Sequence, residues 1–142
     1  MVLITPSEFY RALEKNNIAY TTLQPEQKIC VEFTNYLKEK TLKGNFPFIW
    51  FHVPNEYFRG KVKAGGYFGA IQTAMGRISG VADYCFISRH KSFFIEFKTK
   101  SGKLSSSQQF FEKWCLDKNI HYAICRSSKE GIELVEKMIL LA

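Results

Sequence analysis

Apolar residues recur along the chain at two spacings, and each spacing predicts one kind of secondary structure. Within Gln24–Lys40, Ile29, Phe33 and Leu37 lie four positions apart, which predicts a helix with one buried face. Pro25 suits the first turn of this helix, where its missing N–H would be unpaired in any case. Three further helices are predicted, over Thr5–Asn16, Ser105–Lys118 and Ser128–Leu141. The buried face of the Ser105–Lys118 helix is expected to comprise Phe110, Phe111, Trp114 and Leu116.

Runs of β-branched and aromatic residues, bounded by turn residues, predict the strands. Phe46–Val53 is such a run and is expected to be a buried strand whose aromatic side chains pack in the core. Val81–Ser88 and Lys91–Lys100 are joined by the short Arg89-His90 turn, so they predict an antiparallel hairpin. His121–Ser127 is a further strand.

From the Gln24–Lys40 helix onward the order of elements is α-β-β-β-α-β-α, which predicts an α/β fold with a mixed sheet flanked by helices. A chain of 142 residues is expected to form one domain, residues 1–142, with an N-terminal helical extension over about residues 1–23. With 46% hydrophobic residues the chain has enough apolar surface to fold on its own.

The segment Tyr57–Ala82 differs from the rest of the chain because it is rich in glycine, contains basic residues and has no Asp or Glu. One or two helical turns are expected within Phe68–Met75. The chain has 20 Lys and Arg against 13 Asp and Glu, a formal net charge of +7, which favours nucleic acid or an anionic membrane surface as partner. A solvated surface loop is the alternative for this segment, but its one-sided charge favours contact with DNA. The basic residues concerned are Arg59, Lys61, Lys63 and Arg77.

The remaining composition excludes several classes of protein. No stretch has the roughly 20 apolar residues of a membrane span. The N-terminal residues do not resemble a signal peptide, so a cytosolic protein is expected, in a bacterium or an infected cell. The histidines and cysteines lack the spacing of a zinc site. The four cysteines are expected to be reduced core thiols: Cys30, Cys85, Cys115 and Cys125.

Charged residues interrupt the apolar hairpin. Glu96 and Lys98 share one face of the second strand, and Asp83 lies between apolar residues of the first, thirteen positions before Glu96. A solvated ion pair on the sheet surface is one interpretation. The other is that Asp83 and Glu96 reach one Mg²⁺ from neighbouring strands, since hard cations prefer carboxylate oxygens.

The sequence Gly80-Val81-Ala82-Asp83, followed by Glu96-Phe97-Lys98, resembles the motif of the PD-(D/E)xK nucleases, with Ala82 where the motif name has proline. The following Gly102-Lys103-Leu104-Ser105, together with Gln108, resembles the VRR-NUC branch, the virus-type replication and repair nucleases. Glu26 matches the acidic residue of the first core helix of that branch, and His52-Val53-Pro54-Asn55 is similar to its strand-end signature.

This resemblance extends from Glu26 to the C-terminus and implies a restriction-endonuclease-like core. It implies that Asp83, Glu96 and the Phe97 carbonyl bind Mg²⁺, for which Mn²⁺ could substitute, and that Glu26 completes the site. Lys98 would orient the attacking water or neutralise charge on the phosphate, and Gln108 would support the site. Lys100 and Lys103 would join the basic residues named above in binding DNA.

The expected activity is hydrolysis of DNA phosphodiesters by a structure-selective endonuclease acting on a Holliday junction or other branched DNA in replication and repair. A homodimer is expected, because two active sites related by a two-fold axis allow paired cuts. Two alternatives remain open: a nucleic-acid-binding module without catalysis, and a site-specific endonuclease of a restriction system.

Overall fold

A computed structural model of the chain describes residues 7–54 and 67–142, apart from the side chains of Ser7, Glu8, Tyr10, Tyr67 and Phe68. Four strands form one sheet in the order β1-β2-β3-β4: β1 (Ile49–His52), β2 (Tyr84–Ile87), β3 (Ser92–Phe97) and β4 (His121–Cys125). β1 and β2, and β2 and β3, pair antiparallel, whereas β3 and β4 pair in parallel. The predicted mixed sheet and the predicted β2–β3 hairpin are therefore confirmed.

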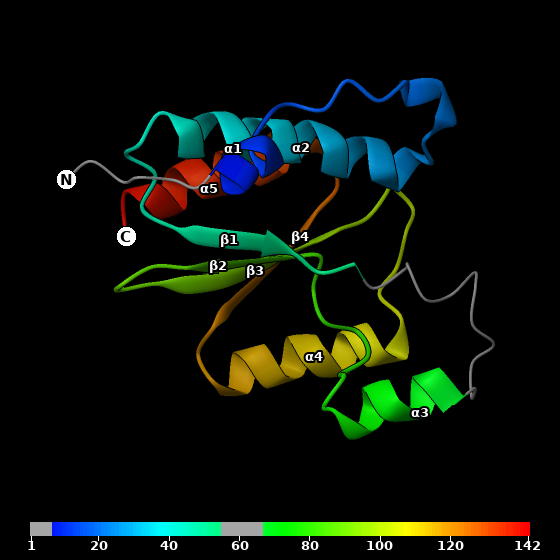
Figure 1. Ribbon diagram of the computed structural model, residues 1–142. Coiled ribbons are helices and arrows are strands. Elements are labelled where there is room, and N and C mark those ends of the chain that lie inside the picture. Colours follow the sequence, from blue (N-terminus) through cyan, green and yellow to red (C-terminus); the bar gives the residue numbers. More distant parts are fainter. Residues whose placement is uncertain (1–6, 55–66) are drawn as a thin grey trace.

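Helices cover both faces of this sheet (Figure 1). α2 (Pro25–Leu42) and α5 (Ser128–Ile139) lie side by side on one face, and α4 (Ser106–Asp117) lies on the other. Three short helical segments complete the described chain: α1 (Ser7–Ala12), the 3₁₀ helix η1 (Tyr20–Thr22) and α3 (Tyr67–Ala74). The architecture is the predicted α/β fold, consistent with a restriction-endonuclease-like core. No helix in these two described ranges is long and apolar enough to cross a membrane.

The main core lies between the sheet and the pair α2 and α5. Phe33 and Leu37 of α2 are fully buried there, as their spacing predicts. They pack with Phe86, Phe93 and other aromatic residues of the strands, many of them edge to face. The four cysteines are free thiols, of which Cys30 is partly buried and the other three are buried.

A second, smaller core lies between α4 and the other face of the sheet. It contains Phe111 and Cys115 of α4, packed with Ala82 and Phe94. The predicted buried face of this helix is wrong in part: Phe110 is 74% exposed, and Trp114 and Leu116 are exposed as well. The helix is rotated so that the stripe through Phe111 and Cys115 faces the sheet.

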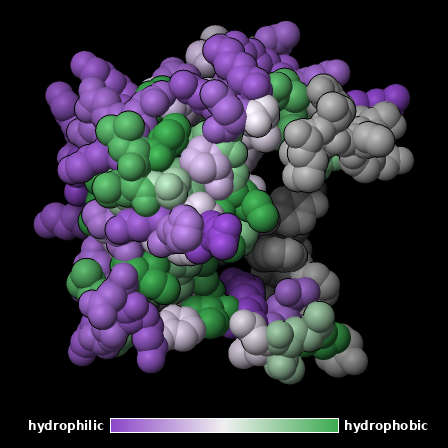
Figure 2. Space-filling model, turned by 90° about the vertical axis from the view of Figure 1, so that its left-hand side faces the viewer, coloured by the Kyte–Doolittle hydropathy of each residue, from purple (hydrophilic) through white to green (hydrophobic). Residues whose placement is uncertain are grey.

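The prediction of a buried Phe46–Val53 strand is also wrong in part. β1 is only four residues long and lies at the edge of the sheet, so Ile49 is 71% exposed and Phe51 47% exposed. Phe48, just before β1, is buried in the main core. Figure 2 shows the end of the molecule where β1 begins, and hydrophobic side chains (green) form patches there among hydrophilic ones.

Candidate metal centre

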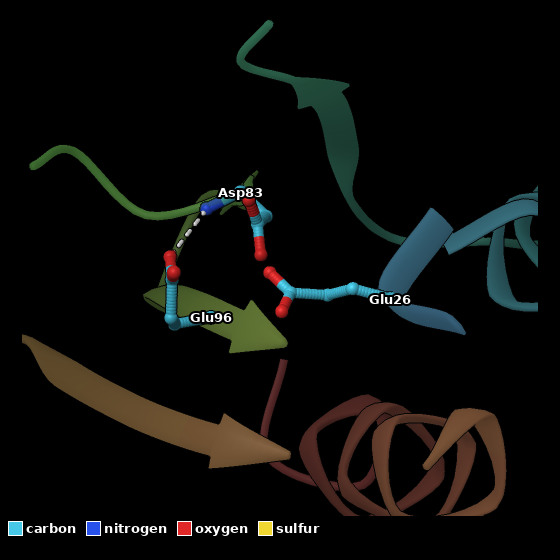
Figure 3. Close-up of side chains that lie close together, drawn as sticks. All are labelled: Glu26, Asp83 and Glu96. Atoms are coloured by element: carbon cyan, nitrogen blue, oxygen red, sulfur yellow. Dashed lines mark hydrogen bonds between the residues drawn. The ribbon is translucent and has the colours of Figure 1, made fainter. Parts of the chain in front are cut away.

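Three carboxylates from three separate elements meet at one end of the sheet. Glu26 lies in the first turn of α2, Asp83 immediately precedes β2, and Glu96 is in β3. The antiparallel register pairs Tyr84 with Ile95, which places Asp83 opposite Glu96. One oxygen of each carboxylate lies within 4.8 Å of the others. Figure 3 shows the side chain of Asp83 between those of Glu26 and Glu96.

Local structure fixes the position of Glu26. Gln24 and Gln27 form a reciprocal capping box, in which Gln24 N donates to Gln27 Oε1 at 2.9 Å. The box defines where α2 begins and keeps Glu26 in its first turn, where the helix dipole favours a negative charge. The acidic residue predicted for the first core helix therefore lies at the site.

Backbone hydrogen bonds join Asp83 and Glu96. Asp83 N donates to Glu96 Oε2 at 3.1 Å, and Phe97 N donates to Asp83 Oδ2 at 2.8 Å. Each acid thus accepts a hydrogen bond from the backbone of the other strand's residues, which sets the direction of both side chains. The Phe97 carbonyl, the further metal ligand that the resemblance implies, stays a prediction.

Burial distinguishes Glu96 from an ordinary surface glutamate. Only 1% of Glu96 is exposed, so the interpretation as a solvated ion pair on the sheet surface is wrong. Burial, followed by the nearby charge of Asp83, raises the pKa of Glu96 to about 8, although Lys98 and the Asp83 N–H act in the opposite direction. The charge of Glu26 raises this pKa further. A cation among the three acids would relieve their repulsion and favour their ionised forms.

Lys98 and Gln108 both reach Glu96. Lys98 Nζ lies 3.6 Å from Glu96 Oε1, and the Lys98 side chain is only 13% exposed. Gln108 Nε2 donates to the same Glu96 Oε1 at 2.6 Å, from the first turn of α4. The structure therefore brings together all five side chains that the sequence analysis assigned to catalysis.

The donor set fits Mg²⁺ or Mn²⁺. Both ions prefer hard oxygen ligands, and Mg²⁺ is commonly bound by one or two protein carboxylates with water or phosphate oxygens completing the shell. Glu26, Asp83 and Glu96 supply only oxygen, and they come close enough together for two or three of them to bind one ion.

A buried tyrosine connects the strand of Asp83 to the helix of Glu26. The Tyr84 hydroxyl lies 2.6 Å from Thr34 Oγ1 and donates to the Cys30 carbonyl at 3.1 Å. Both partners belong to α2, so these contacts hold β2 and α2 in register beside the site. The sequence offered no sign of this role beyond the position of Tyr84 next to Asp83.

Gly80 is a second residue whose role the sequence did not reveal. Its φ is +83°, and a Cβ at this position would lie 2.3 Å from Ser107 C and 2.5 Å from Gln108 N. Only glycine allows the loop before Asp83 to contact the first turn of α4 so closely. This contact helps to place Gln108 beside Glu96.

Arg126 is a third such residue. Its Nη1 donates to the carbonyls of Thr99 and Gly102, each at 2.7 Å, and to that of Lys100 at 3.3 Å. One guanidinium group therefore fixes the turn that follows Lys98. The sequence could not have indicated these contacts, because the acceptors are backbone carbonyls, which no residue type identifies.

The predicted DNA-binding residues lie partly within the described structure. Arg77 lies in the loop between α3 and β2, Lys100 and Lys103 lie in the turn after Lys98, and all three are exposed. Arg59, Lys61 and Lys63 lie outside the described residues. The predicted helical turns in Phe68–Met75 are confirmed as α3.

His52 and Val53, from the predicted strand-end signature, lie at the end of β1 next to this site. Val53 N donates to the Asp83 carbonyl at 2.8 Å, so β1 fixes the backbone of Asp83. Asn55, the last residue of that signature, lies outside the described residues.

Comparisons of the chain with family models, with curated proteins and with solved structures gave no match.

Proposed function

We propose that this protein is a Mg²⁺-dependent DNA endonuclease of the VRR-NUC type. The observation that supports this most directly is the convergence of Glu26, Asp83 and Glu96 next to Lys98, whose Nζ lies 3.6 Å from Glu96 Oε1. An acidic cluster alone is not diagnostic. Its combination with a largely buried lysine and a Gln–Glu hydrogen bond supports metal-assisted phosphodiester hydrolysis, in which a bound cation activates water and neutralises charge on the phosphate.

A divalent cation bound by these carboxylates would supply an activated water and neutralise charge on the scissile phosphate. The residues of the chain prepare the site for it. Asp83 N and Gln108 Nε2 donate to the two oxygens of Glu96 and thereby orient its carboxylate. Lys98 places a positive charge next to the same group, where it can orient the water or stabilise negative charge on the phosphate.

The charge of the surrounding surface favours DNA as the substrate. The formal net charge is +7, although the site itself contains three acids, so the basic residues lie elsewhere on the surface. Lys100 and Lys103 follow Lys98 in an exposed turn, and Arg77 precedes the Asp83 loop. These three residues would bind phosphates on either side of the cut.

Branched DNA, such as a Holliday junction, is the proposed substrate, and a homodimer is the proposed active form. Both proposals rest on the family resemblance. The proposed location is the cytosol of a bacterial or infected cell, where repair or replication intermediates of this kind would be found.

Cleavage assays test the proposal. We expect wild-type protein to cut DNA in the presence of Mg²⁺ or Mn²⁺, and Glu96→Gln and Asp83→Asn to reduce the rate by at least about a hundredfold. Lys98→Gln should reduce cleavage, while DNA binding changes little. Glu133→Gln, on the exposed face of α5, is the matched control and should cleave as wild type does.

The substrate panel should contain a four-way junction, a flap, linear duplex and single-stranded DNA at equal concentration. Discrete fragments from linear plasmid would favour the site-specific restriction endonuclease instead. If no DNA is cut with either metal while DNA binding persists, the protein is a binding module and the nuclease proposal is wrong.

A further inference from the structure

A cavity of about 650 Å³ lies next to the acidic cluster, and Glu26 and Asp83 form part of its wall. Four segments build it: the coil and 3₁₀ turn between Asn16 and Leu23, one face of α2, the end of β1, and Asp83 with Tyr84 at the start of β2. Its volume is typical of sites that enclose a drug-sized molecule. A single nucleotide is a molecule of this size.

The wall contributed by the N-terminal segment is fastened to α2. Asn16 N donates to Asn35 Oδ1 at 3.2 Å, and Lys38 Nζ donates to the Glu14 carbonyl at 3.1 Å. Within the segment, Ile18 N donates to Asn16 Oδ1 at 2.8 Å. Figure 1 shows η1 next to the beginning of α2. The cavity is therefore formed before any ligand enters it, and part of it comes from residues that precede the region of family resemblance.

The chemistry of the wall favours a flat and uncharged group. Ile18, Leu23, Val31, Val53 and Pro54 line the cavity with apolar surface. Three side-chain amides also line the cavity, those of Asn16, Gln27 and Asn35. Each has a hydrogen-bond donor and an acceptor, so they are suited to bind the polar edge of a flat ligand. Among the described lining residues Lys38 is the only lysine or arginine, and the acids at one end would repel a phosphate not bound to a cation.

A nucleobase has these properties: two apolar faces and a rim of hydrogen-bonding groups. His52 offers a stacking surface, since its ring lines the cavity and lies 4.9 Å from that of Tyr84, centroid to centroid. The position of the cavity also fits a base. If a phosphate is bound at the acidic cluster, the base of the same nucleotide lies within reach of the cavity, because Glu26 and Asp83 belong to both the cluster and the cavity wall.

We infer that this cavity binds the base of a nucleotide adjoining the scissile phosphate, turned out of the DNA stack. The inference rests on the proposed nuclease function and specifies its substrate class. A base leaves the stack most readily where it is mismatched or unpaired. The preferred substrates are therefore DNAs with an unpaired nucleotide at the cut, such as bulges, flaps and branch points, rather than fully matched duplex.

The test compares two duplexes that differ only by one unpaired nucleotide. Binding is measured by fluorescence anisotropy with Ca²⁺, which takes the same oxygen ligands as Mg²⁺ in a looser geometry. We expect wild-type protein to bind the bulged duplex at least about tenfold more tightly than the matched one. Ile18→Trp, which fills the cavity from a coil segment, should remove this preference, so that the bulged and the matched duplex bind about equally.

Leu42→Trp is the matched control, since Leu42 is 41% exposed, close to the 45% of Ile18, and lies at the far end of α2. It should keep the wild-type preference. Val31→Phe fills the cavity from α2 and provides a second variant, should Ile18→Trp not fold as judged by circular dichroism. A preference absent from the wild type, or unchanged in a folded cavity-filling variant, would overturn the inference.

The two proposals can fail separately. If Mg²⁺ supports no cleavage but the cavity variants abolish a clear preference for bulged DNA, the nuclease proposal fails and the base-binding cavity remains. If cleavage depends on Glu96 but matched and bulged duplexes are bound and cut equally, the cavity does not bind a base and the nuclease proposal remains.

Discussion

Gln108 and Glu96 are joined by a hydrogen bond of 2.6 Å, from the Nε2 of a residue in the first turn of α4 to a carboxylate buried in β3. The same amide caps its own helix, because Gln108 Oε1 accepts a hydrogen bond from Ser105 N at 2.9 Å. One side chain thus defines the start of α4 and orients a predicted metal ligand. The two roles can be separated by substitution.

Gln108→Glu should keep the capping box, since glutamate serves as well as glutamine at this position, but it removes the donor to Glu96. It also adds a carboxylate to a site that already contains three. We expect a loss of about ten- to a hundredfold in Mg²⁺ affinity or cleavage rate, the usual effect of removing a hydrogen-bond partner of a metal ligand. Isothermal titration with Mg²⁺ and cleavage rates measure it.

Gln109→Glu is the control for the added charge, because Gln109 is exposed and its Nε2 donates to the Leu104 carbonyl instead. It should bind Mg²⁺ as the wild type does. Equal effects of the two substitutions would show that charge alone is responsible and that the Gln108–Glu96 hydrogen bond has no specific role.

The raised pKa of Glu96 predicts how the stability of the metal-free protein depends on pH. Glu96 has a pKa of about 8 in the folded protein, against 4.5 for an unperturbed glutamate. Between these values the folded state binds the additional proton, so the free energy of unfolding should decrease as the pH rises from about 4.5 to about 8. Urea unfolding in EDTA across this range measures the decrease.

Glu96→Gln removes the titrating group and should flatten this part of the profile, whereas the exposed Glu133→Gln should leave it unchanged. Adding Mg²⁺ at pH 8.5 should restore stability to wild-type protein, because an ion that binds only the folded state stabilises it. Identical profiles for wild type and Glu96→Gln would show that Glu96 does not titrate in this range.

Much of the site could be predicted because it depends on local patterns. The alternation of side chains along a strand places Glu96 and Lys98 on the same face, and the short turn of the hairpin brings Asp83 opposite Glu96. The four-residue spacing of Phe33 and Leu37 identified α2 and its buried face. These features need no knowledge of how distant elements pack.

The orientation of α4 shows where such reasoning ended. Phe110 and Trp114 form one stripe with a spacing of four residues, and Phe111 and Cys115 form another, so hydrophobicity alone did not separate the two, and the predicted face included Phe110 and Trp114 as well as Phe111. The structure buries Phe111 and Cys115. Gln108 is three residues before Phe111, on the same side of the helix, so its assignment to the site could have identified the correct stripe.

The edge position of β1 and the cavity beside α2 could not be predicted for a different reason. The order of strands in a sheet and the path of the N-terminal segment depend on contacts between residues far apart in the sequence. The hydrogen bond between Asn16 and Asn35 is one such contact. Neither asparagine belongs to a pattern that identifies the other.

The close approach of Gly80 to α4 predicts a large effect of a single methyl group. Gly80→Ala should displace the first turn of α4, since the new Cβ would lie within 2.5 Å of the Ser107 and Gln108 backbone. Gln108 would move away from Glu96 with it. We expect a loss of about 1–2 kcal/mol from the left-handed conformation and about 1–3 kcal/mol more from overpacking, measured by urea unfolding.

Gly44→Ala separates these two contributions. Gly44 has a φ of +86°, close to the +83° of Gly80, but a Cβ there would have no atom within 4 Å. It should therefore lose only the conformational contribution and retain full Mg²⁺ affinity. If Gly80→Ala costs no more than Gly44→Ala, the contact with α4 does not position Gln108.

The three carbonyls bound by Arg126 Nη1 predict that the length of this side chain matters more than its charge. Arg126→Lys keeps the charge, but the shorter lysine side chain ends one atom before the Nη1 position that contacts the carbonyls of Thr99, Lys100 and Gly102. We expect a loss of about 1–3 kcal/mol in the free energy of unfolding, because partly buried carbonyls lose their donor.

The turn that Arg126 fixes also contains Lys100 and Lys103, so its loosening should weaken DNA binding as well as cleavage.

Arg89→Lys, in the exposed β2–β3 turn, is the control for the same change of residue type, and it should alter the free energy of unfolding by less than about 0.5 kcal/mol. Amide hydrogen exchange of residues 99–103 distinguishes the proposed role from a general loss of stability. Faster exchange should be confined to this turn in Arg126→Lys, and an unchanged rate there would refute a positioning role for Arg126.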